Sequence, residues 1–388
     1  MKSASVPPSC ATARTRISLV EDFSALAGRR SEWNALVERS QTNTVFQTYE
    51  FHAAWWSVFG RESRGLVLLA EEHGELVGIA PLMVRERRML GSSRRTVQFI
   101  GSRSFDYCDF IVERTRQDVL SLLLDRLVEE EGSDLLHLRD IPGTSSTVDS
   151  LQRFFADRKV GIDARILYHA PTRVFNDPVA DRQLANKKSL KRHHNYFQRS
   201  GKLAFRHFRS TEEVAPFLDC FFEQHVSRRA VTDTPSLFND RRMRDFFRAL
   251  AASLSDTGWL LFTVVLYNDE PIAMHYGFEY GGRIIWYKPA FEMDLAKHSP
   301  GEVLIKCLLE YALERQVREL DFTIGEEAFK YRFANHSRPN YAVRVHRRWV
   351  SYHLSRLLQD ARALVERYPA TRRLGRKALA RWRDDPWL

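Results

Sequence analysis

Apolar residues in the first half of the chain follow helical spacing first and strand-like spacing later. Two early segments repeat every three or four residues, at Trp33, Leu36 and Val37 and again at Phe51, Trp55 and Val58. The apolar runs 66–70 and 76–82 flank His73-Gly74, which predicts a β-hairpin. A strand at 97–100 leading through Gly101 into 106–112, a helix over 118–130 and a strand at 135–138 are predicted next.

The second half shows the same order of elements. A hairpin is predicted from 259–267 and 271–278, followed by a strand at 283–287, a helix over 302–314 and a strand at 319–322. With a shift of 184 residues, Val119, Leu124 and Leu136 fall on Val303, Leu308 and Leu320. This ordered recurrence predicts a duplicated module rather than two unrelated helix–strand units.

The predicted fold class is therefore α+β, with two modules whose mixed, mostly antiparallel sheets are flanked by helices. We expect a disordered leader at 1–16, an N-terminal module at 17–180 and a C-terminal module at 181–348. A basic amphipathic helical tail is predicted at 349–388, where apolar residues recur at helical spacing up to Pro369 and basic residues dominate beyond it.

Composition narrows the class of protein. Of 388 residues, 44% are hydrophobic and 28% charged, which is typical of a soluble globular chain. The four cysteines stand alone without metal-ligand spacing, so neither a disulfide scaffold nor a metal site is expected. The longest apolar run, 259–266, is far below the roughly 20 residues of a membrane span. With no apolar leader segment visible, we expect a cytoplasmic protein.

Positive charge is the main compositional bias. The formal net charge is +10, and the segment 184–209 carries eight Lys or Arg residues and no acidic one. This segment predicts a basic helix followed by a strand, either as a solvated face or as a phosphate-binding surface. A basic tail with tryptophan would suit the inner face of an anionic membrane, although a helix packed on its own domain fits the same pattern.

The segment Ser299-Pro300-Gly301-Glu302-Val303 indicates an anion site. A loop ends and a helix begins there, so free backbone N–H groups and the positive helix end would face a phosphate. Gly301 would allow close approach, while Glu302 departs from a purely cationic pocket.

A second motif runs from 321 to 333, in the order D-F-x2-G-x-E-x2-K-x-R-F. Together with Ser-Pro-Gly at 299–301, Asp106-Tyr107-Cys108-Asp109 and the F-x3-H-x2-R segment at 221–228, it resembles the CelD-like branch of the GNAT acyltransferases. That branch is similar to Fem-type aminoacyltransferases and carries two tandem GNAT modules. The resemblance covers about residues 17–348.

The resemblance implies transfer of an acyl group from acyl-CoA, as co-substrate, to a primary amine, without a metal. Residues 299–303 would hold the diphosphate, and Lys330 and Arg332 a phosphate or carboxylate. His225 is the favoured general base, because its ordinary pKa lies near neutral pH. Asp106 would orient the amine or act as base, and Tyr287 would protonate the leaving thiolate. Purely structural roles stay open for these residues. His225 would be a helix histidine bonded to a backbone carbonyl, Asp106 a turn cap, and Lys330 and Arg332 members of surface ion pairs.

Three functions remain open at this point. The first is N-acylation of an amine, including an amino-lipid such as a sphingoid base, at a membrane surface. The second is aminoacyl transfer from tRNA, with 187–209 gripping RNA phosphates, as the Fem-type likeness permits. The third is a non-catalytic scaffold for envelope polysaccharide or lipid assembly, because only one glycine of the usual phosphate loop is kept at 297–301.

Overall fold

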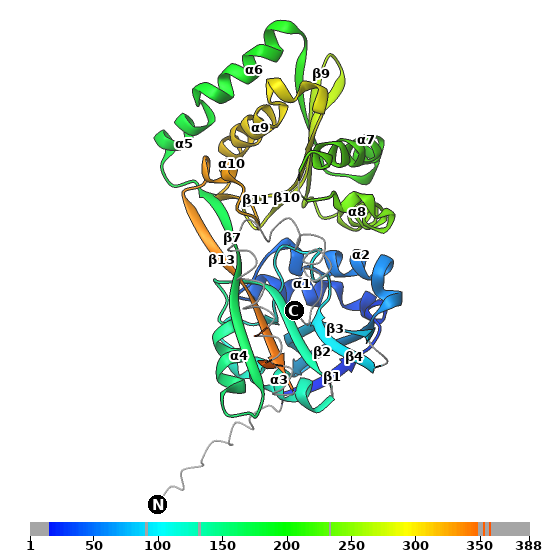
Figure 1. Ribbon diagram of the computed structural model, residues 1–388. Coiled ribbons are helices and arrows are strands. Elements are labelled where there is room, and N and C mark those ends of the chain that lie inside the picture. The colour runs from blue at the N-terminus through cyan, green and yellow to red at the C-terminus, as the bar shows by residue number, and fades with distance from the viewer. Residues whose placement is uncertain are drawn as a thin grey trace, which may run out of the picture.

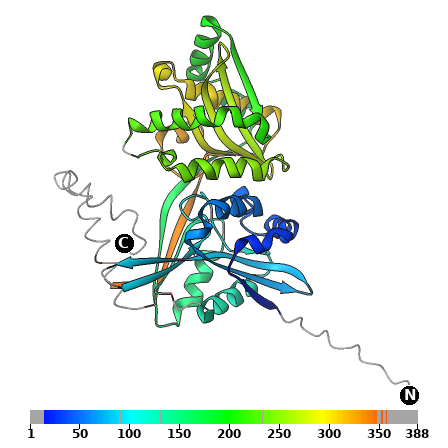
Figure 2. The ribbon, with the colours of Figure 1, turned by 90° about the vertical axis from the view of Figure 1, so that its right-hand side faces the viewer.

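The computed structural model describes residues 15–89, 92–130, 133–232 and 234–347, with Tyr352, His353 and Leu357 beyond them. The predicted leader up to residue 14 and nearly all of the predicted tail lie outside the described residues. Two lobes follow each other along the long axis of the molecule, and a pair of long strands runs from one to the other (Figures 1 and 2).

One mixed sheet extends through both lobes. Its strand order is β1-β2-β3-β4-β6-β13-β7-β12-β11-β10-β9-β8, with β5 beside β3. The strands are β1 Arg16–Val20, β2 Arg64–Glu72, β3 Glu75–Met89, β4 Ser92–Phe99, β5 Ile111–Val112, β6 Leu135–Pro142, β7 Gly161–Val174, β8 Leu203–Phe208, β9 Leu260–Tyr267, β10 Glu270–Tyr280, β11 Arg283–Phe291, β12 Glu319–Asp321 and β13 His336–His346. The predicted α+β architecture, with mixed and mostly antiparallel half-sheets flanked by helices, is confirmed.

Helices cover the sheet in both lobes. In the N-terminal lobe they are α1 Arg30–Arg39, α2 Tyr49–Phe59, α3 Gln117–Glu130 and α4 Thr147–Ala156. In the C-terminal lobe they are α5 Pro178–Ala185, α6 Lys188–Ser200, α7 Thr211–Ala230, α8 Arg241–Leu254, α9 Pro300–Glu314 and α10 Ala328–Tyr331. Local sequence explains several starts: Ser210 and Glu213 form a capping box at α7, and Asp240 caps α8.

The two lobes repeat one topology. An antiparallel hairpin, β2–β3 or β9–β10, is followed by a third strand, a crossover helix and a strand that pairs in parallel with the third. The crossover helices α3 and α9 begin within two residues of the helices that the spacing of leucines predicts. This agreement follows from their buried apolar faces, which include Leu120 and Leu124 in one and Leu304 and Leu308 in the other.

Strands β7 and β13 join the lobes and were not predicted. They pair with each other from Gly161–His346 to Thr172–His336, while β13 also pairs with β6 and β7 with β12. The last strand of each half therefore lies between the two half-sheets. The boundary predicted near residue 180 falls between the helices of the N-terminal lobe and those of the C-terminal lobe. The sheet itself is continuous across both lobes.

The parallel pair in each lobe is short, and its strands then diverge. In the N-terminal lobe only Thr96 and Val97 pair with β6. Residues 105–112 occupy the space beyond: β5 pairs with the start of β3, and the N–H of Cys108 donates to the carbonyl of Asp140 at 2.9 Å. The predicted strand over 106–112 is thus reduced to Ile111–Val112, because the preceding residues fill this gap as irregular chain.

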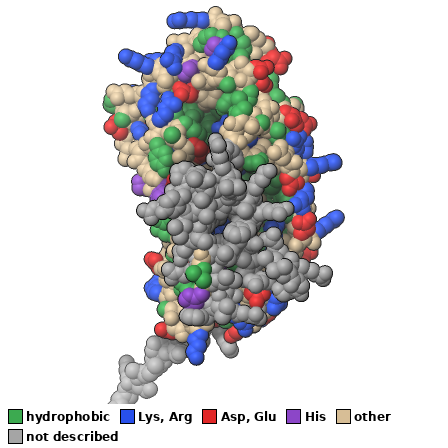
Figure 3. Space-filling view, viewed as in Figure 1, with side chains coloured by type: hydrophobic (Ala, Val, Ile, Leu, Met, Phe, Trp, Pro, Cys, Tyr) green, Lys and Arg blue, Asp and Glu red, His purple; other side chains and the backbone are tan. Residues whose placement is uncertain are grey.

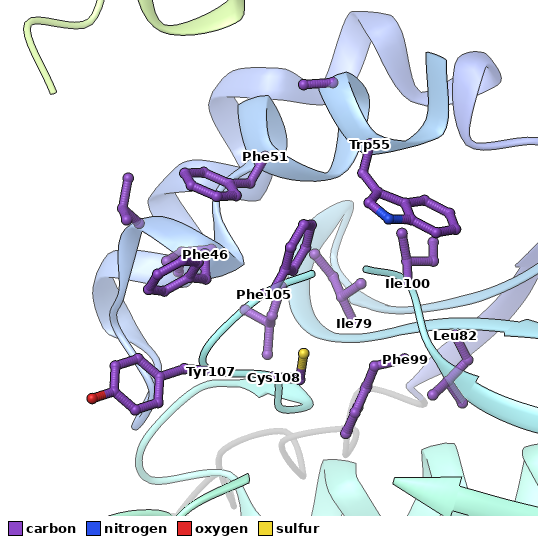
Figure 4. Packing of buried hydrophobic residues seen from close by; sticks show 14 of the residues in the cluster. Phe46, Phe51, Trp55, Ile79, Leu82, Phe99, Ile100, Phe105, Tyr107 and Cys108 are labelled. Carbon is purple, nitrogen blue, oxygen red and sulfur yellow. The ribbon is translucent and has the colours of Figure 1, made fainter. Parts of the chain in front are cut away.

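The filling segment is apolar on its inner side. Phe105 and Cys108 are each 1% exposed and pack beneath α2, beside Phe51 and Phe99 (Figure 4). Tyr107 belongs to the same cluster, but its hydroxyl points out of it (Figure 4). The N-terminal divergence is therefore part of the hydrophobic core.

Candidate active site

The corresponding divergence in the C-terminal lobe lies between β11 and β12. Only Arg283, Ile284 and Ile285 pair with β12, and β11 then continues alone beside β10 to Phe291. A β-bulge sits at this point, since Tyr276 pairs with Lys288 but Phe278 with Ile285. Bulges commonly redirect side chains next to active sites.

A buried histidine holds this bulge. The backbone N–H of Tyr287 donates to Nε2 of His275 at 3.2 Å, and the imidazole stacks on Trp286. A side chain at Gly277 would collide with the His275 ring, its Cβ lying only 1.9 Å from Cε1. Burial lowers the pKa of His275 to about 3, so the ring is neutral and accepts at Nε2. Sequence reasoning did not single out His275.

The loop 104–107 of the N-terminal lobe forms one wall of the C-terminal divergence. The hydroxyl of Tyr287 donates to the carbonyl of Ser104 at 2.5 Å. The hydroxyl of Tyr107 donates to both carboxylate oxygens of Asp321 on β12, at 3.0 and 2.9 Å. The segment that fills one divergence therefore reaches the other, and it brings the predicted residues Asp106 and Tyr287 to one place.

Lys288 lies between Asp106 and Tyr287 at the C-terminal divergence. It was not identified from the sequence. Its ammonium lies 3.6 Å from Oδ1 of Asp106 and 3.7 Å from the centre of the Tyr287 ring. The two charged side chains are only 19% and 6% exposed. Burial lowers the pKa of Lys288, and the carboxylate of Asp106 opposes this shift. The available signal was a single lysine in the apolar strand Arg283–Phe291.

His225 is a buried residue of α7, and its Nδ1 lies 2.7 Å from Oγ of Ser236. Burial, followed by the charges of Arg229, Arg228 and Lys288, lowers its pKa to about 3. The near-neutral pKa that favoured His225 as a base is therefore not kept, and its catalytic role stays a prediction.

Lys330 is buried against the loop that follows β12. Its ammonium donates to the carbonyl of Ile324 at 2.7 Å and lies 2.9 Å from the Glu327 carboxylate. Gly325 has φ +118, and a side chain there would meet the Glu327 carboxylate and the Lys330 ammonium. Lys330 is thus already bonded within the protein, while its charge contributes to lowering the pKa of Lys288.

The positive N-terminal end of α9 is partly neutralised by groups of the protein itself. The N–H groups of Glu302 and Val303 donate to the carbonyl of Ser299, at 2.9 and 3.4 Å, and Pro300 has none. The Glu302 carboxylate pairs with Arg332 at 2.7 Å. Ser299 has φ 54, and a Cβ on Gly301 would meet only the Phe291 ring.

These contacts leave room beside Gly301 but supply a carboxylate where a diphosphate was predicted. A donor phosphate would have to compete with Glu302 for both the helix end and Arg332. The binding roles of Ser299, Pro300, Gly301, Glu302, Val303, Lys330 and Arg332 therefore stay predictions. Among the described residues, no group of three or more His, Cys, Asp or Glu side chains could hold a metal ion.

Comparisons with known proteins bear on the family and the fold. Residues 185–331 match the family model described as "Acetyltransferase (GNAT) domain". No curated protein sequence matches the chain. Within the described part of the chain, no helix combines the length and apolar character needed to cross a bilayer.

Several solved structures share the fold. FemX is 11% identical with a TM-score of 0.56, covering 81% of this chain and 95% of FemX. A conserved protein of unknown function from Bacteroides thetaiotaomicron is 11% identical with a TM-score of 0.55, covering 86% and 100%. L-PGS from Bacillus licheniformis is 12% identical with a TM-score of 0.51, covering 89% and 96%. The match of residues 185–331 to the GNAT acetyltransferase domain confirms the prediction of an N-acyltransferase enzyme, while the solved structures show the shared fold.

Proposed function

We propose that acyl transfer from a thioester to a primary amine takes place where β11 and β12 diverge, beside the Asp106–Lys288 pair. One observation carries this proposal: two oppositely charged side chains, both mostly buried, meet at the point where a β-bulge interrupts strand pairing. Buried ionisable groups with shifted pKa values concentrate at functional sites.

The chemistry needs a proton acceptor and an oxyanion donor. The amine nitrogen attacks the thioester carbonyl carbon, the C–S bond breaks, and the nitrogen loses a proton while the thiolate gains one. In this proposal the Asp106 carboxylate accepts the amine proton and the Lys288 ammonium stabilises the oxyanion. Tyr287, whose hydroxyl is held by Ser104, shapes the site and remains the candidate that protonates the thiolate.

For the donor we propose acyl-CoA, with its pantetheine arm between β11 and the chain after β12. The GNAT match supports a CoA thioester. In this proposal the diphosphate lies at Gly301, and Arg332 turns from Glu302 to the phosphate. Glu302 makes this exchange less favourable and is the feature that would tune donor affinity.

For the acceptor we propose an amine-bearing molecule that includes amino-lipids such as sphingoid bases. The net charge of +10 and the basic tail at 349–388 favour an anionic membrane surface as its source. Cosedimentation of the full chain with anionic vesicles, compared with a chain ending before Pro369, tests this part. Unchanged binding after truncation would remove the membrane argument.

Aminoacyl-tRNA is the second candidate donor, and α6 favours it. Lys188, Lys191, Arg192 and Arg199 are exposed on this helix, which has no acidic residue. Lys and Arg side chains gather at the end of the molecule that carries α6 (Figure 3). Binding of tRNA that weakens steeply between low and physiological salt, together with aminoacyl transfer, would favour this donor over CoA.

The test is an acyl-transfer assay with the purified full chain. A series of acyl-CoA chain lengths is incubated with primary amines, and both the free thiol and the N-acyl product are measured by mass spectrometry. We expect product from wild type and from Asp219→Asn, an exposed control on α7, and far less product from Asp106→Asn. Absence of product with every donor, including aminoacyl-tRNA, would instead support a non-catalytic assembly protein.

A further inference from the structure

A cavity of about 520 Å³ lies between the two lobes, next to the proposed site. Tyr107 and Asp321, which hydrogen-bond each other at the divergence of β11 and β12, form part of its wall. Tyr107 lines the cavity, and its neighbour in the same loop, Asp106, pairs with Lys288. The cavity and the charged pair therefore meet at adjacent residues of this loop. A ligand in the cavity could extend from here to the reacting carbonyl.

Four arginines and two carboxylates line this cavity. One arginine is neutralised, since Arg338 donates to both oxygens of Glu319 at 3.0 and 2.7 Å. The second carboxylate, Asp321, accepts hydrogen bonds from Tyr107 and from the N–H of Thr323.

The other three arginines hydrogen-bond neutral carbonyls. Arg283 donates to the carbonyl of Asn43 at 2.6 Å, Arg318 to that of Gly281 at 2.6 Å, and Arg114 to that of Ser40 at 3.2 Å. Arg283 also lies 3.9 Å from Glu319, which Arg338 already holds in a closer pair. A carbonyl accepts a hydrogen bond but does not compensate a charge, so the cavity keeps an excess of positive charge.

One further polar atom among the lining residues is an unpaired donor. Oγ1 of Thr44 is buried and has no hydrogen-bond partner, whereas the unpaired Oδ1 of Asn43 is an acceptor and does not favour an oxyanion. Buried polar atoms are rarely left unpaired in folded proteins, unless a water or ligand completes them. The hydroxyl of Thr44 can donate to an oxyanion, as can the guanidinium groups beside it.

We propose that this cavity binds an oxyanion, a phosphate or a carboxylate, carried by the amine acceptor. The oxyanion lies among Arg114, Arg283 and Arg318, and the amine of the same molecule reaches Asp106 past Tyr107. This inference rests on the proposed acyl-transfer function, and it narrows the acceptor to amines that bear an anionic group. The excess positive charge would also attract such molecules from solution.

Equilibrium binding tests the cavity without any turnover. Inorganic phosphate and acetate serve as separate probes in calorimetry and thermal melts of the full chain, which distinguishes the two kinds of oxyanion. We expect one of them to bind wild type and Arg315→Gln, an exposed control paired with Glu279 outside the cavity. Arg318→Gln and Arg114→Gln should each weaken binding about tenfold, as expected for a lost charge-assisted hydrogen bond.

Kinetics then tests the link to the acceptor. O-phosphoethanolamine, β-alanine and ethanolamine are compared as amines with one acyl-CoA. We expect a lower KM for one of the two anionic amines than for ethanolamine, and Arg318→Gln should raise only that KM, with kcat unchanged.

Equal probe binding by wild type and by the Arg114→Gln/Arg318→Gln double variant would overturn the proposal, as would no probe binding by wild type. Arginine-dependent binding without turnover of any amine would leave the cavity standing and contradict the acyl-transfer function instead.

Discussion

The two lobes build the same divergence of parallel strands and use it differently. In the N-terminal lobe, the gap between β4 and β6 is filled by residues 105–112, and Phe105 and Cys108 become core. In the C-terminal lobe, the gap between β11 and β12 is walled by the polar side of the same loop, which presents Asp106 and Tyr107. Duplication thus supplied two equivalent gaps, one filled by apolar core and one bordered by polar and charged side chains.

On this account the proposed site belongs to the pair of modules. Asp106 comes from the first half of the chain and Lys288 from the second, and neither half has both. Strands β7 and β13, which lie between the two half-sheets, join the lobes that carry these side chains. An isolated C-terminal module would therefore lack one wall of its own site.

The largest effect is expected at the charged pair of the C-terminal divergence. Asp106→Asn keeps the shape but removes the proton acceptor, so kcat for acyl transfer should fall by a factor on the order of 10²–10⁴. Steady-state assays with acyl-CoA and a responsive amine check this, with circular dichroism to confirm folding. Full activity in a folded Asp106→Asn variant would break the assignment of the site to this lobe.

The next effect is expected in the filled divergence and concerns stability. Phe105 is 1% exposed, and Phe105→Ala should lower the free energy of unfolding by about 3–5 kcal/mol, because a cavity remains. Leu122→Ala, at a 39% exposed position on α3, should change it by less than about 0.5 kcal/mol. Urea unfolding measures both. A small loss for Phe105→Ala would mean that the first divergence is not core.

Buried histidines at both divergences predict a pH dependence of stability. Burial lowers the pKa of His52, beside Phe105, to about 4 and that of His275 to about 3. The unfolded chain regains values near 6.5, so it binds more protons, and stability is lost as the pH falls below about 6.5. Between pH 6.5 and 5 each histidine should cost about 1–2 kcal/mol.

Urea unfolding at these two pH values tests this dependence. His275→Gln should reduce the loss of stability, whereas His73→Gln, in an exposed hairpin turn, should leave it unchanged. Equal losses in wild type and His275→Gln would contradict burial of a neutral imidazole at the bulge.

The smallest effect is expected at the start of α9. Glu302→Gln removes a favourable charge from a helix N-terminus and a partly exposed pair with Arg332, which costs about 0.3–1 kcal/mol. The same change should strengthen CoA binding, because Arg332 and the helix end become free. Thermal melts with and without CoA measure both, with the exposed Glu314→Gln on the same helix as control. Unchanged CoA binding would remove residues 299–303 from the donor site.

The sequence was sufficient for the repeated hairpins and crossover helices, because their apolar periodicity is set by burial on one face. The sequence was insufficient for β7 and β13, because neither strand shows a regular alternation of buried and exposed residues. Few residues of β7 are buried, and burial is irregular along the first part of β13. Asp106 was predicted from a motif and Tyr287 from its strand before the Ser-Pro-Gly loop, and the catalytic roles of both stay predictions. Lys288 and His275 were missed because only the fold brings a lone lysine to Asp106, and only the bulge turns a backbone N–H toward the imidazole.

Hydrogen exchange of the full chain with and without a non-hydrolysable acyl-CoA tests the central claim most directly. The account predicts slower exchange of backbone amides in 286–291 and 322–325, the two segments that part at the C-terminal divergence, and no change in 108–112, which fills the N-terminal divergence. Protection confined to other segments, in a protein that transfers acyl groups, would contradict it.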